Sequence, residues 1–158
     1  MVGGRMISEV EQYINEHIPI VKKHNFQITE EVSPFIQVKG TLKDHINHRN
    51  SVFGGSISTS LIVASWASVR NILLTRGIPS GIIVIQSEHV EFSKPLIDDF
   101  YAELRPISDD RLTKFIAMIN KFGKSRIKIE ADVKDCKNNE ICASFTGEYV
   151  VLLNDTIV

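Results

Sequence analysis

The sequence has almost no charge imbalance, few cysteines and none of the common metal or nucleotide patterns. Its 158 residues include 18 basic and 19 acidic side chains, a formal net charge of −1, so no overall field directs the chain to nucleic acid or acidic lipid. The five histidines form no i,i+4 pair, and no phosphate loop, dinucleotide fingerprint or nucleophile elbow is present. We therefore expect no metal, no cofactor and no nucleic-acid partner. A local basic cluster, KFGKSRIK at 121–128, alternates with apolar residues and is interpreted as the solvated face of a strand.

Only two cysteines are present, Cys136 and Cys142, and they flank the segment KNNEI. If the two asparagines between them form a two-residue hairpin turn, Cys136 faces Ile141 and Cys142 faces Asp135. The two thiols would then point to opposite sides of the ribbon, which disfavours a disulfide. No cleavable signal opens the chain, because its first residues lack an apolar core of the required length. We expect a cytoplasmic protein with reduced thiols.

Charge is missing altogether from residues 51–69, which contain no Asp, Glu, Lys, Arg or His. A segment of this length can cross a bilayer or run through the middle of a protein. Membrane spans are dominated by Leu, Ile, Val and Phe, whereas this segment holds seven Ser or Thr residues. Because its neighbours have the pattern of soluble strands, we predict a buried helix covered by a sheet, and no membrane span.

The remaining chain has one helical pattern and several strand patterns. Residues 7–18 place apolar side chains at helical spacing, and Ser8 followed by Glu11 predicts a capping box near the start of that helix. In residues 126–134 charged and apolar side chains alternate, which predicts a strand with one wet and one buried face. Short breaks, such as SDD at 108, favour sequential antiparallel pairing. Strands are predicted at 25–32, 34–42, 81–92, 99–107, 112–120, 125–135 and 141–153.

Three segments resemble the hotdog-fold thioesterase family that is named after the C-terminal domain of the bacterial protein YiiD. They are NHRNSVFGGS at 47–56, the single Trp66, and IVIQSEHVEFSKPLIDDF at 83–100. The family motif has Asn-His, two residues, Thr or Ser, an apolar pair and Gly-Gly-Ser at the start of its helix. The resemblance covers roughly residues 25–155 and implies an α+β hotdog fold, in which an antiparallel β-sheet wraps around a long central α-helix. It also implies a homodimer or higher oligomer. Because the sequence contains no internal repeat, low-complexity tract or linker, we expect one domain over residues 1–158, with an N-terminal helical segment at 1–24.

The Gly-Gly-Ser segment suits the chemistry of acyl transfer. Attack of water on a thioester carbonyl produces an oxyanion, which needs hydrogen-bond donors already in place. The N-terminus of a buried helix supplies unpaired backbone N–H groups, and Gly54 and Gly55 have no side chain to block a carbonyl from reaching them. The alternative is that these glycines only permit a tight turn into the helix, and the resemblance favours the functional interpretation. We expect the backbone of Gly54, Gly55 and Ser56 to bind the oxyanion, and Phe53 and Ser56 to contact the substrate.

The resemblance also assigns roles in the preceding loop. Asn47 would orient the carbonyl or the attacking water, although a loop Asn often bonds only its own backbone. His48 is either a base that works near neutral pH or a solvent-exposed loop residue, and the sequence leaves both open. Asn50 stands where the family has Gly; since Asn tolerates the left-handed conformation, we expect the turn to survive and Asn50 to lie near the substrate.

The expected helix carries no acid, although many hotdog thioesterases place a catalytic Asp or Glu there. A carboxylate base would come from elsewhere, such as Glu88 or Glu91 of the next strand, or general-base catalysis by a carboxylate would not occur. Pairing of two subunits would bring Glu88 or His89 to the partner's helix. Both are otherwise exposed strand residues. The leading hypothesis is hydrolysis of an acyl thioester on coenzyme A or acyl carrier protein. The alternatives are decarboxylation of a malonyl thioester, which needs no base, and a non-catalytic acyl-binding module.

Overall fold

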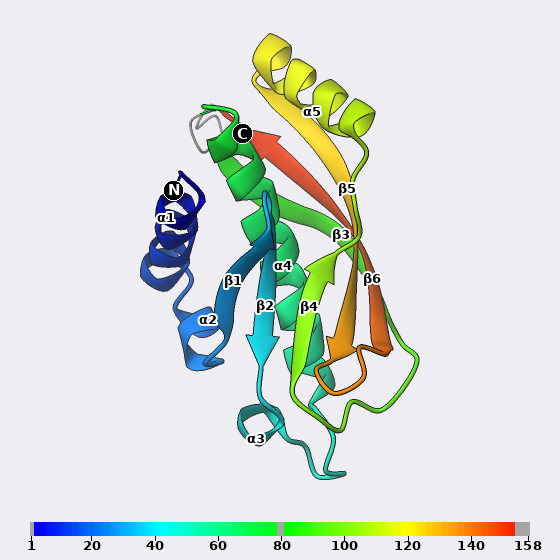
Figure 1. Ribbon diagram of the computed structural model, residues 1–158. Helices are drawn as coiled ribbons and strands as arrows, with labels where there is room; N and C mark the ends of the chain where they lie inside the picture. Colours follow the sequence, from blue (N-terminus) through cyan, green and yellow to red (C-terminus); the bar gives the residue numbers. More distant parts are fainter. Residues whose placement is uncertain (1, 79–80, 154–158) are drawn as a thin grey trace.

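The computed structural model describes residues 2–78 and 81–153, with side chains from residue 7 onward. Six strands form one antiparallel sheet in the order β1-β2-β4-β5-β6-β3, so that β1 and β3 are its two edges. The sheet curves around the long helix α4, as Figure 1 shows. The elements are α1 Val2–His17, α2 Pro19–Lys23, β1 Gln27–Val32, β2 Phe35–Gly40, α3 Leu42–His45, α4 Gly54–Thr75, β3 Ile82–Phe92, β4 Phe100–Leu104, α5 Asp109–Phe122, β5 Lys124–Asp135 and β6 Ile141–Leu152.

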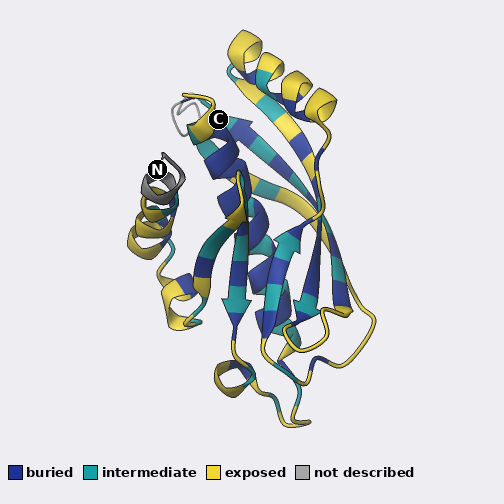
Figure 2. Cartoon of the chain, in the orientation of Figure 1, coloured by how far each residue is buried: buried dark blue, intermediate teal, exposed yellow. Residues whose placement is uncertain are grey.

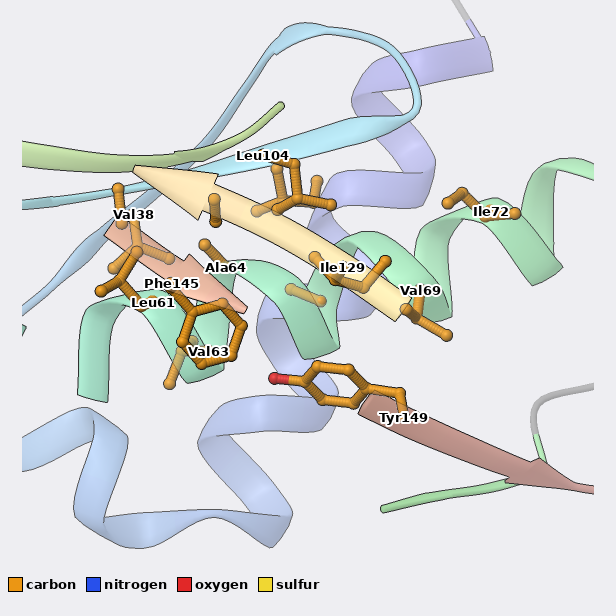
Figure 3. Packing of buried hydrophobic residues seen from close by; sticks show 14 of the residues in the cluster. Val38, Leu61, Val63, Ala64, Val69, Ile72, Leu104, Ile129, Phe145 and Tyr149 are labelled. Atoms are coloured by element: carbon orange, nitrogen blue, oxygen red, sulfur yellow. The ribbon is translucent and has the colours of Figure 1, made fainter. Parts of the chain in front are cut away.

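Helix α4 is the centre of the hydrophobic core, as the uncharged segment predicted. Leu61 and Ala64 are fully buried, and side chains from several strands point toward the helix in Figure 3. The Tyr149 hydroxyl on β6 donates to the carbonyl oxygen of Ile62 at 3.0 Å, which links sheet and helix. By length and composition alone α4 could cross a membrane, but most of it is buried inside the sheet. The predicted α+β hotdog architecture is confirmed.

The N-terminal helices cover one side of this core. Val10 and Ile14 of α1 are fully buried, which confirms the helical spacing. The guanidinium carbon of Arg70 lies 3.7 Å from the centre of the Tyr13 ring, a cation–π contact that joins α1 to α4. The predicted capping box is wrong, because α1 begins before Ser8 and this residue lies inside the helix.

The prediction of a strand at 112–120 is wrong, because these residues belong to α5. Leu112, Phe115 and Ile119 are the buried residues of this helix, and their spacing of three and four is helical rather than alternating. The SDD segment is the start of the helix: the Ser108 hydroxyl accepts a hydrogen bond from the N–H of Arg111. Gly123 ends the helix with a left-handed φ of 67°.

Two smaller predictions about the β5–β6 hairpin also need correction. Ile141 pairs with Lys134, not with Cys136, because a register shift after Val133 and a longer turn replace the two-residue turn. Cys136 is an exposed free cysteine and Cys142 a buried one. The alternation of β5 predicted an exposed side chain at Asp132, but this carboxylate is buried. It accepts two hydrogen bonds from the Arg105 guanidinium at 2.8 and 2.9 Å.

Candidate functional site

A tight loop before α4 carries Asn47 and His48, two of the predicted catalytic residues, while the third, Gly55, lies in the first turn of α4. Ile46 and Val52 form an isolated antiparallel bridge, and the N–H of Asn47 donates to the Ser51 carbonyl oxygen at 2.8 Å. Asn50 closes the turn with a left-handed φ of 59°, as its tolerance for this conformation predicted. The loop is therefore a closed hairpin with a fixed shape.

The side chain of Asn47 holds this loop together. Its Oδ1 accepts hydrogen bonds from the N–H of Arg49 at 2.8 Å and from the N–H of Ser51 at 3.3 Å. Its Nδ2 donates to the Ser51 hydroxyl at 3.1 Å. A primary amide has two N–H donors, and the second donor has no partner among the described residues, so it can bind another acceptor. Asn47 bonds its own loop, as a structural Asn would, and keeps one donor in a fixed position.

The first turn of α4 has two N–H groups to offer. The N–H groups of Ser56 and Ile57 both donate to the carbonyl oxygen of Phe53, at 2.9 and 3.2 Å. The N–H groups of Gly54 and Gly55 have no hydrogen-bond partner in the part of the chain that the structure describes. These two N–H groups lie at the N-terminus of the helix, where the helix dipole places a partial positive charge. The arrangement can therefore bind a carbonyl oxygen that becomes negatively charged.

The two glycines differ in what surrounds them. A Cβ on Gly54 would meet only the Phe92 ring at 3.6 Å, an ordinary contact. A Cβ on Gly55 would collide with the ring of Phe53, which lies in the space that a side chain would fill. A side chain at position 55 would therefore have to displace the exposed Phe53 ring, whereas a methyl group at position 54 displaces nothing.

His45 is a residue that the sequence reasoning missed. It is buried in α3, and its Nδ1 lies 2.9 Å from the hydroxyl of Ser56 in α4. Its carbonyl oxygen also accepts a hydrogen bond from the N–H of Phe53 at 2.8 Å. Burial lowers the pKa of His45, and the neighbouring His24 lowers it further, which favours the neutral imidazole. His45 therefore ties the loop to the first turn of α4 through both its backbone and its ring.

An open cleft of about 320 Å³ lies beside the start of α4. We call it the α4 cleft; it is lined by Ser51, Val52, Gly54, Ile57, Phe92, Ser93, Lys94, Pro95 and Leu96. Of the predicted site residues only Gly54 lines it, while Asn47 reaches it through its hydrogen bond to Ser51. Ser51, Phe92 and Lys94 are lining residues that the family motif did not single out as site residues.

The other predicted residues lie outside this cleft. His48 and Asn50 are exposed in the loop, and Phe53 is 58% exposed beside Gly55. Glu88 and His89 are exposed on the edge strand β3, opposite Gly147 and Thr146 of β6. They precede Phe92 by four and three residues, or roughly 13 and 10 Å along the strand. One subunit alone does not bring them to Gly54.

Two absences limit the chemistry of the site. Helix α4, all of which the structure describes, contains no Asp or Glu from Gly54 to Thr75. Among the described residues no group of three or more His, Cys, Asp or Glu is placed to hold a metal ion. The chemistry that these residues supply themselves is binding and polarising a carbonyl group through backbone N–H donors.

The sequence and the fold were compared with those of known proteins. A family model described as "Putative thioesterase (yiiD_Cterm)" matches residues 7–153. Among solved structures, the fold is similar to that of a protein of unknown function from Chlorobaculum tepidum, at 20% identity and a TM-score of 0.88, over 96% of this chain and 97% of that one. No curated protein matches the chain.

Two further solved structures share the fold. A protein from Shewanella oneidensis described as a "putative thioesterase" is 21% identical with a TM-score of 0.78, over 94% of this chain and 99% of that one. A thioesterase from Haemophilus influenzae is 12% identical with a TM-score of 0.72, over 96% of this chain and 94% of that one. At these identities the likeness shows the hotdog fold.

Proposed function

Since the chain belongs to the thioesterase family named after the C-terminal domain of YiiD, we propose that it hydrolyses acyl thioesters carried on coenzyme A or an acyl carrier protein. The acyl group enters the α4 cleft with its carbonyl oxygen against the N–H groups of Gly54 and Gly55. Water attacks the carbonyl carbon, the oxygen becomes an oxyanion, and the carbon–sulfur bond then breaks. The products are a carboxylic acid and a free thiol.

One observation carries this proposal: the unpaired N–H groups of Gly54 and Gly55 at the start of a buried helix, next to an open cleft. Donors fixed in advance stabilise the oxyanion without reorganising during the reaction. Ser56 takes no direct part, because its N–H and its hydroxyl already bond Phe53 and His45. Asn47 positions the attacking water or the carbonyl through its remaining N–H.

The proton acceptor comes from outside α4 in this proposal. Glu88 and His89 are the candidates, because they are exposed on β3, whose outer edge pairs with no described strand. An open edge of eleven residues invites pairing with another chain. We infer a homodimer in which two β3 strands pair about a two-fold axis, and Glu88 or His89 of the partner subunit completes the site.

The missing acid of α4 favours a second candidate, decarboxylation of a malonyl thioester. The same donors would then stabilise an enolate, and no base would be needed. The two reactions give different products, because hydrolysis releases a thiol and decarboxylation releases carbon dioxide while the thioester remains.

A product assay on purified protein separates the two. Saturated acyl thioesters and a malonyl thioester, each on coenzyme A and on carrier protein, are incubated while free thiol and carbon dioxide are measured. We expect thiol release from the saturated substrates. Acetyl thioester and carbon dioxide from the malonyl substrate, without free thiol, would replace hydrolysis by decarboxylation. Binding of acyl-CoA without any product would make the protein an acyl-binding module.

A further inference from the structure

The positive charge of this protein is concentrated in one segment. Residues 111–128 contain six basic residues and no acidic one, whereas the rest of the chain has 12 basic and 19 acidic residues, a formal net charge of −7. The six are Arg111, Lys114, Lys121, Lys124, Arg126 and Lys128, all exposed. A protein with a net charge near zero thus has one strongly positive region.

Helix α5 from Arg111 onward and the first half of β5 form this region, and the acidic first turn of α5, Asp109 and Asp110, adjoins it. Strand β4 pairs with β5 only as far as Leu104, opposite Ala131, so the start of β5 has no β4 neighbour. Helix α5 packs against β5, and Arg111 donates from its guanidinium to the carbonyl oxygen of Lys128. The fold therefore holds α5 and its charges in a fixed place, with the exposed side of the helix outward in Figure 2.

A groove of about 380 Å³ runs between α5 and β5. Four basic side chains line this α5 groove, those of Arg111, Lys114, Arg126 and Lys128, together with one acidic side chain, Glu148, and the apolar Phe115, Met118 and Ile127. Met118 is 47% exposed. The groove thus has both cationic and apolar walls, as a binding surface for an acidic amphipathic helix does.

The distribution of the charges fits a broad acidic surface better than a single phosphate group. Lys114 is paired with Asp110 at 2.8 Å, and Arg126 with Glu148 at 3.2 Å. Lys121, Lys124 and Lys128 take part in no ion pair in the described part of the chain. From Lys124 to Lys128 alone the strand extends roughly 13 Å. Cations spaced in this way do not converge on one anion but match acidic residues along a protein surface.

The position of the groove relates it to the site of a second subunit. Within one subunit, Figure 1 shows α5 at the opposite end of the molecule from the loop between α3 and α4. Lys124 lies level with Ile82 of β3, since both pair with Leu152, whereas Gly54 adjoins Phe92 at the other end of β3. If two β3 strands pair in antiparallel orientation, the two α4 clefts lie at opposite ends of the paired strands. In the proposed β3 dimer, the α5 groove of one subunit would therefore lie toward the α4 cleft of its partner, three strand spacings, or about 14 Å, across the sheet.

We propose that α5 and the first half of β5 dock an acidic carrier protein, which presents its thioester to the α4 cleft of the partner subunit. This inference rests on the proposed thioesterase function and the β3 dimer. The flexible arm that carries the thioester spans the distance from the groove to the cleft. Of the two proposed carriers, coenzyme A and carrier protein, this surface selects the protein.

The test compares two charge-reversal variants of equal net charge. Lys121→Glu with Lys128→Glu changes the proposed surface, and Lys22→Glu with Lys23→Glu changes exposed lysines of α2 as the matched control. For each protein we measure binding of a holo acyl carrier protein by calorimetry, and kcat/KM for one acyl chain on carrier protein and on coenzyme A. We expect the first variant to bind the carrier about tenfold more weakly and to lower the carrier-to-CoA ratio of kcat/KM about tenfold. The control keeps both values near wild type.

Each other result has a distinct meaning. Equal binding and equal ratios in both variants would overturn the docking surface while leaving hydrolysis intact. Loss of carrier binding in the first variant, in a protein that hydrolyses neither substrate, would support docking and reject the proposed activity. Binding of anionic vesicles or single-stranded nucleic acid to this surface, with no binding of the carrier, would overturn the proposal.

Discussion

Asn47 combines a structural role with a proposed catalytic one, and two substitutions separate them. Asn47→Asp keeps the oxygen that accepts from Arg49 and Ser51, but it removes both side-chain N–H donors and adds a negative charge. Asn47→Ala removes the oxygen as well. If the free N–H helps to stabilise the transition state, both variants lose turnover.

The structure sets the expected magnitudes. Removing one oxyanion donor costs roughly a hundred- to thousandfold in kcat, and the added charge of Asn47→Asp makes this variant at least as slow. KM should change little, because the interaction strengthens mainly in the transition state. Asn47→Ala loses one good hydrogen bond, from the N–H of Arg49 at 2.8 Å, and the weaker contacts with the N–H and the hydroxyl of Ser51 at 3.1 to 3.3 Å. In a half-buried loop this amounts to about 1 kcal/mol, or about 3 °C in melting temperature.

Steady-state kinetics and thermal melts on the same preparations measure both effects. We expect Asn47→Asp to melt within about 1 °C of wild type while its turnover falls at least a hundredfold. Wild-type turnover per folded molecule in Asn47→Asp would refute the reasoning and leave Asn47 with its loop contacts alone. His48→Ala is the comparison: we expect a smaller, pH-dependent loss from this exposed residue.

Three further predictions concern stability and assembly. Burial lowers the pKa of His45, so the unfolded chain takes up a proton below about pH 6.5 that the folded chain does not, and stability is lost as the pH falls. The melting temperature of the wild type should therefore fall further between about pH 7 and pH 5 than that of His45→Gln. Parallel curves of melting temperature against pH for the two proteins would contradict this. Arg105→Ala leaves the buried Asp132 carboxylate with Ser144 as its remaining side-chain partner, and should lower the free energy of unfolding in urea at pH 7 by about 2 kcal/mol. The double variant with Asp132→Asn should recover most of this loss. Val84→Glu, at a position 44% exposed on β3, should shift the dimer toward monomer in light scattering, and a wild-type monomer would reject the β3 dimer.

Much of the fold could be predicted from patterns that local physics imposes. The charge-free residues 51–69 indicated the buried helix, and alternation at 126–134 indicated a strand with one wet face. The misread segment 112–120 contained the correct signals as well. Leu112, Phe115 and Ile119 follow helical spacing between a Ser N-cap and a terminal Gly, but the many strands around them favoured the wrong interpretation.

The remaining features depend on contacts between distant residues. His45 meets Ser56 only because α3 and the loop fold back onto α4, and neither residue shows this in its local pattern. Asp132 is buried because β4 brings Arg105 beside it, which the alternation of β5 alone does not predict. The loop bonds of Asn47 required its turn geometry, in which Asn50 adopts a positive φ. The sequence therefore predicted unpaired donors at the start of this helix, and the hydrogen bonding assigns them to Gly54 and Gly55 rather than to Ser56, whose N–H bonds Phe53.

The central claim is that the N–H groups at the start of α4 bind the reacting carbonyl, and Gly54→Ala tests it most directly. A methyl group there makes only ordinary contacts with Phe92 at 3.6 Å, so the fold should keep its stability or gain slightly in helix propensity. The same methyl group stands beside the donor and hinders the approach of the carbonyl oxygen. We predict a melting temperature at or above wild type together with a fall of at least tenfold in thiol release from acyl thioesters, in line with partial loss of an oxyanion donor. Wild-type thiol release by a stable Gly54→Ala variant would contradict the account.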